Sequence, residues 1–185
     1  MRYLISFIFF ATGLAIGWII PDVDSTVRFL THRSIITHSF IWPLIFYLVA
    51  RRAGDPIRPR YSALTMGLGL ALAVHFCFDL FPRTWRGFAL IHVPLYGRSD
   101  VLFSQIWLVV SILICLYLAL HLATGLFDIT LLAGGALVSF ALMGTAEPLG
   151  RPLTAFAIAT IVVTAVDWTK LIRRTARSTP TTKKS

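Results

Sequence analysis

Six long apolar runs constrain most tightly what this chain can fold into. Each run is 16 to 22 residues long, and short segments carrying charges, proline or glycine separate one from the next. A helix of that length spans, or nearly spans, the hydrocarbon core of a bilayer. We therefore expect an all-α, polytopic membrane protein with about six transmembrane helices, at residues 3–20, 35–50, 61–81, 101–122, 126–144 and 152–168.

The composition agrees with a membrane-embedded chain. Of its 185 residues, 57% are hydrophobic and 14% are charged, whereas soluble domains are about half apolar and about a quarter charged. We expect residues 1–169 to form a single helical domain. The basic residues 170–185, rich in Ser and Thr, are expected to form a disordered tail. Cys77 and Cys115 lie within apolar runs, where buried thiols are expected.

The net charge of +9 does not indicate a nucleic-acid partner. The basic residues gather at the ends of the apolar runs, and no recognisable nucleic-acid-binding fold accompanies them. Six spans put both termini on one face, which then carries 11 Lys and Arg residues against 6 on the other. The positive-inside rule therefore predicts cytoplasmic termini. We expect a multi-pass protein of a bacterial or archaeal cell membrane, in contact with membrane lipids.

The stretch from Pro21 to Ser39 is unusually polar for this chain. Asp22 and Asp24 occupy alternate positions and can point to one site, although acidic residues also occur at membrane exits without one. His32 and His38 are six residues apart, which places them on different faces of a continuous helix. Both can reach one metal only if the backbone breaks between them. Alternatively, each is an interfacial hydrogen-bonding residue.

A second polar pair, His75 and Asp79, lies inside the third apolar run. Side chains four residues apart emerge from one face of a helix. A carboxylate within a span costs about 3 kcal/mol at the membrane centre and less near the surface, so such residues usually face a polar interior. One interpretation is a structural His–Asp hydrogen bond between helices. The other is a metal site shared with the Pro21–Ser39 stretch, because the predicted topology puts both on the outer face.

Carboxylate oxygen and imidazole nitrogen suit zinc, manganese or iron. We expect a divalent metal, with zinc favoured, held by Asp22, Asp24, His38, His75 and Asp79. More than four candidate ligands leave room for two metals, which suits phosphoester hydrolysis.

Other polar residues are candidates for roles beside the ligands. His32 is a further ligand or a general acid/base. Arg33 can hold an anionic phosphate through a bidentate fork, or can neutralise lipid headgroups. His92, Asp100 and Glu147 are weaker candidates on the same face.

Three segments together resemble a known family. They are Pro21-Asp-Val-Asp24, then His32-Arg33 through Thr37-His38-Ser39, then His75-Phe-Cys-Phe-Asp79 followed by Pro82. In order and surroundings they resemble the predicted membrane-bound metal-dependent hydrolases, some of the LexA-binding, inner-membrane-associated type. The resemblance covers residues 10 to 100. That family is distantly similar to zinc-dependent phospholipases C, which implies phosphoester hydrolysis on a multi-metal site.

The sequence thus favours a membrane-embedded, metal-dependent hydrolase acting on a phospholipid or another amphiphilic phosphoester at the membrane interface. One alternative is a non-enzymatic membrane protein with a structural metal site. Another is a metal or ion transporter, which would need polar residues continuing along the third run. Beyond His75 that run offers only Thr65 and Ser62.

Overall fold

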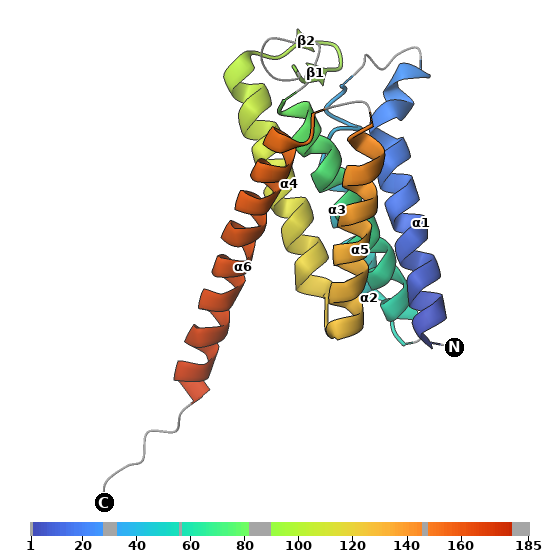
Figure 1. Ribbon diagram of the computed structural model, residues 1–185, viewed down its shortest axis with the longest axis vertical. Helices are drawn as coiled ribbons and strands as arrows, with labels where there is room; N and C mark the ends of the chain where they lie inside the picture. Colours follow the sequence, from blue (N-terminus) through green and yellow to red (C-terminus); the bar gives the residue numbers. More distant parts are fainter. Residues whose placement is uncertain (1, 28–32, 56, 82–89, 146–147, 179–185) are drawn as a thin grey trace, which may run out of the picture.

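The computed structural model describes residues 2–27, 33–55, 57–81, 90–145 and 148–178. Most of these residues are helical, which confirms the predicted all-α class. In Figure 1 the helices run along the long axis, with the start of α1 at the lower end and a small hairpin at the upper end. The elements are α1 (Arg2–Asp22), a 3-10 turn η1 (Val23–Ser25), α2 (Ile41–Arg52), α3 (Ile57–Asp79), β1 (His92–Val93), β2 (Gly97–Arg98), α4 (Val101–Leu122), α5 (Leu126–Met143) and α6 (Gly150–Ser178).

Four of the described helices are long and apolar enough to cross a membrane: α1, α3, α4 and α5. The apolar part of α6, Gly150–Val166, is shorter. α2 has 12 residues, which extend about 18 Å at about 1.5 Å per residue. A bilayer core is about 30 Å thick. The predicted run at residues 35–50 is therefore not one long helix.

α2 begins at Ile41, later than the apolar pattern predicts, because the residues before it make other contacts. The main chain at 33–40 forms turns and an isolated bridge, and its polar groups bond to neighbouring segments. Pro43 lies in the first turn of α2 and is buried. A proline there removes no helical hydrogen bond, since the first N–H groups of a helix have no partner within it.

α3 is the centre of the bundle. Every residue from Ala63 to Asp79 is buried, and α3 packs against α1, α2, α4, α5 and α6. A helix that is apolar on all faces and surrounded by other helices is what the interior of a larger bundle requires. His75 and Asp79 lie at the last turn of this central helix and are buried.

Glycines allow α1 and α3 to approach closely. A Cβ at Gly13 would overlap the carbonyl oxygen of Leu64, and a Cβ at Gly67 would overlap the carbonyl oxygen of Phe10. Small residues at such crossings are typical of membrane helix pairs. On α5, a Cβ at Gly135 would meet Phe10 at 2.8 Å, whereas Gly134 faces open space.

Two smaller expectations concern the last helix and the cysteines. α6 continues to Ser178, past residue 170, where the sequence predicts the start of a disordered tail. Residues 179–185 of that tail lie outside the described residues. Cys77 and Cys115 are free and buried, as predicted.

Candidate metal centre

The site lies at the end of the bundle where α1 and α3 finish and α2 begins. The segment 33–40, which precedes α2, runs between these ends and carries His38 into the interior. His38 is 1% exposed, His75 9% and Asp79 8%. Three titratable side chains are thus withdrawn from solvent at one point, although they come from segments some 40 residues apart.

His38, His75 and Asp79 converge. Each offers one ligand atom, and these atoms all lie within 4.8 Å of one another. The Oδ2 atom of Asp79 is 3.2 Å from Nε2 of His38 and 3.6 Å from Nε2 of His75. Four-coordinate zinc with bonds of about 2.0–2.1 Å separates its ligand atoms by about 3.3 Å. The spacing therefore fits a divalent ion bound between the three side chains.

The Oδ2 atom of Asp79 is also a buried oxygen that accepts no hydrogen bond of normal geometry within the described residues. Leaving a buried carboxylate oxygen without a partner costs free energy, and the two imidazole nitrogens lie near enough to it for the three atoms to share one centre. A cation at that centre would satisfy all three groups. The donor set, two imidazoles and one carboxylate, is one that zinc accepts in catalytic sites with a fourth position open.

Asp24 lies behind His38. Its Oδ2 atom accepts hydrogen bonds from the backbone N–H of Ser34 at 2.9 Å and from the Thr37 hydroxyl at 3.0 Å. The same atom is 3.5 Å from Nδ1 of His38. Asp24 is 1% exposed, so its carboxylate is buried against the segment that carries His38 and is hydrogen-bonded to that segment. The sequence predicts Asp24 as a ligand, whereas the structure places its Oδ2 atom on the edge of the imidazole away from Asp79.

This arrangement selects one tautomer of His38. Nδ1 faces acceptors, the Thr37 hydroxyl oxygen at 3.1 Å and the Asp24 carboxylate, and therefore carries the proton. The lone pair then lies on Nε2, the atom nearest Asp79. A carboxylate that orients a histidine in this way is a common feature of zinc sites and strengthens the imidazole as a ligand.

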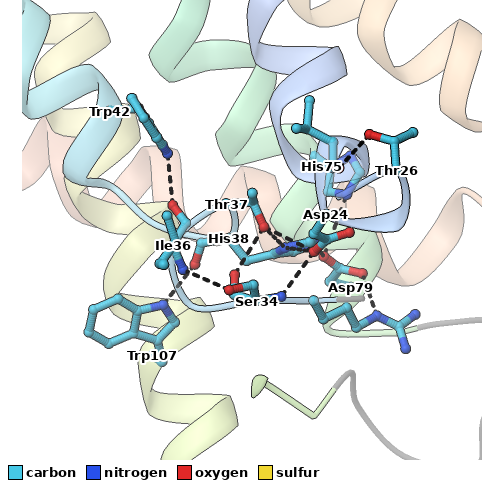
Figure 2. Close-up of polar contacts among 12 residues, drawn as sticks. Asp24, Thr26, Ser34, Ile36, Thr37, His38, Trp42, His75, Asp79 and Trp107 are labelled. Atoms are coloured by element: carbon cyan, nitrogen blue, oxygen red, sulfur yellow. Dashed lines mark hydrogen bonds and ion pairs between the residues drawn. The ribbon is translucent and has the colours of Figure 1, made fainter. Parts of the chain in front are cut away.

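Two tryptophans fix the backbone around His38. The indole N–H of Trp107 donates to the carbonyl of His38 at 2.7 Å, and that of Trp42 donates to the carbonyl of Ile36 at 2.7 Å. Figure 2 shows both rings on the side of the segment away from Asp79. The two tryptophan hydrogen bonds hold the backbone on one side of His38, and the contacts of Asp24 with Ser34 and Thr37 hold it on the other. Together they hold the imidazole in place.

Arg33 lies at the opposite edge of the site. Its Nε atom is 3.4 Å from Oδ1 of Asp79, so the two oxygens of Asp79 face an arginine and a pair of histidines. The Arg33 side chain as a whole is partly exposed, at 26%. An arginine beside the ligands leaves donors available to an anion that approaches from solvent.

The hairpin β1–β2 holds Arg33 in this position. His92 donates its backbone N–H to the carbonyl of Arg33, and its own carbonyl accepts from the N–H of Ile35, both at 2.9 Å. Arg33 has a φ of 65°, a left-handed conformation that costs a non-glycine residue on the order of 1 kcal/mol. The flanking hydrogen bonds impose it.

The remaining predicted residues have different outcomes. Asp22 is exposed at the end of α1 and is not among the three converging side chains. Asp100 caps α4 by accepting from the N–H of Phe103 at 2.8 Å. The Nδ1 atom of His92 is buried with no hydrogen-bond partner in the described part of the chain. His32 and Glu147 lie outside the described residues.

Sequence reasoning missed the residues that support His38. Ser34, Thr37, Trp42 and Trp107 are common residue types at a membrane interface, and nothing in their spacing distinguishes them. The available signal was the Thr37-His38 pair itself, since a hydroxyl next to a histidine can set its tautomer.

Comparison of the chain with protein-family models, with curated proteins and with solved structures finds no significant match.

Proposed function

We propose that this protein is a membrane-embedded, divalent-cation-dependent hydrolase of phospholipids or other amphiphilic phosphoesters. The observation that carries the proposal is the convergence of His38, His75 and Asp79, in which the buried Oδ2 atom of Asp79 has no hydrogen-bond partner among the described residues and Arg33 lies beside the carboxylate. The three segments that resemble the membrane-bound metal-dependent hydrolases support the same assignment.

In this proposal the three converging side chains hold the cation, which we take to be zinc. A divalent ion bound there would supply a Lewis acid that polarises a phosphoryl oxygen and makes water a nucleophile near neutral pH. Asp24 orients His38 through Nδ1. Arg33 holds the phosphate anion, and His32 serves as general acid or base.

The surroundings of the site favour an amphiphilic substrate. The site is at the end of the bundle, the level at which headgroups lie beside a membrane-spanning protein. Apolar and aromatic side chains there are exposed, including Leu95 and Tyr96 at the hairpin turn and Ile36 beside the site. We further propose six membrane crossings, with α2 and α6 completing the four long helices, and cytoplasmic termini.

Two alternatives predict different behaviour. A structural metal site would use the same ligands without turnover, and the hydrogen bonds around His38 are as well suited to rigidity as to catalysis.

A transporter would need a polar path along α3. The Thr65 hydroxyl bonds to the carbonyl of Tyr61 at 2.7 Å, and the α3 residues between Thr65 and His75 are apolar and buried, which favours the hydrolase over transport.

We expect purified protein in nanodiscs to hydrolyse a phospholipid with release of a phosphorylated headgroup or of phosphate. Chelation should abolish the activity, and zinc or manganese should restore it. A water-soluble phosphodiester should be hydrolysed more slowly, by roughly tenfold or more, because binding energy from the acyl chains contributes to the rate.

The matched control is Asp128→Asn. Asp128 lies at the other end of the bundle and accepts from Thr124, so its substitution should leave turnover unchanged. A wild-type protein that retains stoichiometric metal but hydrolyses neither substrate would overturn the hydrolase assignment and favour the structural metal site.

A further inference from the structure

Arg33 and a cation in the site would share one carboxylate. The Oδ2 atom of Asp79 faces His38 and His75, and its Oδ1 atom lies 3.4 Å from Nε of Arg33. The charge of Asp79 is therefore divided between a fixed cationic side chain and any ion held by the histidines. A positive charge so near a metal site weakens cation binding by electrostatic repulsion.

Hydrogen bonds on both sides fix the backbone of Arg33. Its carbonyl is bonded to His92 and the following N–H to Asp24, and the positive φ of Arg33 is fixed between these bonds. The Nε atom is buried yet donates no hydrogen bond of normal geometry within the described residues. The pair with Asp79 thus provides charge contact but not the aligned, bidentate geometry that arginine forms with a well-placed oxyanion.

We propose that Arg33 couples cation binding to phosphate binding, so that the site holds the two together more tightly than it holds either one alone. This inference rests on the proposed function. A phosphate group that bridges the cation and the guanidinium places negative charge between two positive ones and gives the arginine the aligned partner that Asp79 does not. Each ligand then tightens the binding of the other by the same factor, because coupling between two binding sites is reciprocal. Uncharged esters and carboxamides would gain nothing from Arg33.

The test measures zinc affinity of the purified protein by competition with a chromophoric chelator, with and without an anion. One arm uses inorganic phosphate. The other compares nanodiscs of phosphatidylcholine alone with nanodiscs that also contain phosphatidic acid, which distinguishes free phosphate from a lipid headgroup as the source. We expect inorganic phosphate or phosphatidic acid, whichever is the ligand of the site, to increase the zinc affinity by about fivefold or more.

The informative variant is Arg33→Asn, because asparagine tolerates a left-handed backbone better than most residues. We expect it to bind zinc more tightly than wild type in the absence of anion, by about fivefold, and to lose the enhancement by phosphate. Arg33→Lys keeps the positive charge but removes the bidentate guanidinium. Its zinc affinity without anion should therefore stay near that of wild type, while the increase in zinc affinity caused by phosphate should become smaller. Arg98→Gln, an exposed arginine on the same hairpin, should change neither quantity.

The outcomes separate this inference from the proposed function. If Arg33→Asn binds zinc equally or more weakly, or keeps the full phosphate effect, the coupling role is wrong even though the metal site stands. If wild type binds no zinc at all, the metal site itself is wrong. A purely structural Arg33–Asp79 pair predicts lower zinc affinity in the variant, the opposite sign from the coupling role.

Discussion

Replacing Asp79 with asparagine should reduce the metal content of the purified protein from about one ion per chain to a small fraction of that value. The substitution keeps the size of the side chain and removes the charge that attracts the cation. Loss of an outer-shell partner of a metal ligand typically costs about 10–100-fold in affinity, and loss of a charged ligand should cost at least as much. Elemental analysis after gel filtration measures the content and checks the fold together.

Asp128→Asn is the matched control for this experiment, since it removes one carboxylate from the far end of the bundle. His75→Ala should behave as Asp79→Asn does. A structural His–Asp pair predicts a different result, in which asparagine keeps part of the hydrogen bonding, metal content is untouched and only thermal stability falls. Full metal occupancy in both Asp79→Asn and His75→Ala would be incompatible with the proposed site.

Replacing Gly67 with leucine should prevent the close packing of α1 against α3. Even the first carbon of the new side chain would overlap the carbonyl oxygen of Phe10, and this oxygen belongs to helical backbone that cannot move alone. The helices must separate, which we expect to cost roughly 3 kcal/mol or more. The variant should show a lower melting temperature in detergent and a smaller yield of monodisperse protein.

Gly134→Leu is the corresponding control on α5, because a Cβ at Gly134 meets nothing within 4 Å. It should retain the wild-type melting temperature within a few degrees. If Gly67→Leu and Gly134→Leu have equal stability, the α1–α3 crossing described here is wrong.

The parts of the site that follow helical periodicity could be predicted from the sequence. His75 and Asp79 are four residues apart in an apolar run, and a helix puts both side chains on one face. That His38 joins them is expected from the predicted even number of crossings between the two motifs. In the structure His38 lies beside the last turn of α3, whereas the number of membrane crossings stays a prediction.

Other features depend on contacts between distant segments, which spacing does not encode. Asp24 faces the Nδ1 edge of His38 because the 3-10 turn η1 and the N–H of Ser34 set its direction. The delayed start of α2 depends on the hairpin that bonds to Arg33 and Ile35. The apolar pattern of residues 35–50 does not indicate that the helix begins only at Ile41. Likewise, the tight crossing of α1 and α3 is at Gly13 and Gly67, two glycines from distant parts of the chain.

The most direct test of the metal site is the X-ray absorption spectrum of the zinc-loaded, wild-type protein at the zinc edge. We predict a first shell of nitrogen and oxygen at about 2.0–2.1 Å, with scattering from two imidazoles, those of His38 and His75. No sulfur should appear, although Cys77 lies two residues from His75. A zinc–sulfur distance of about 2.3 Å, a shell with fewer than two imidazoles, or a protein that takes up no stoichiometric zinc would contradict the account.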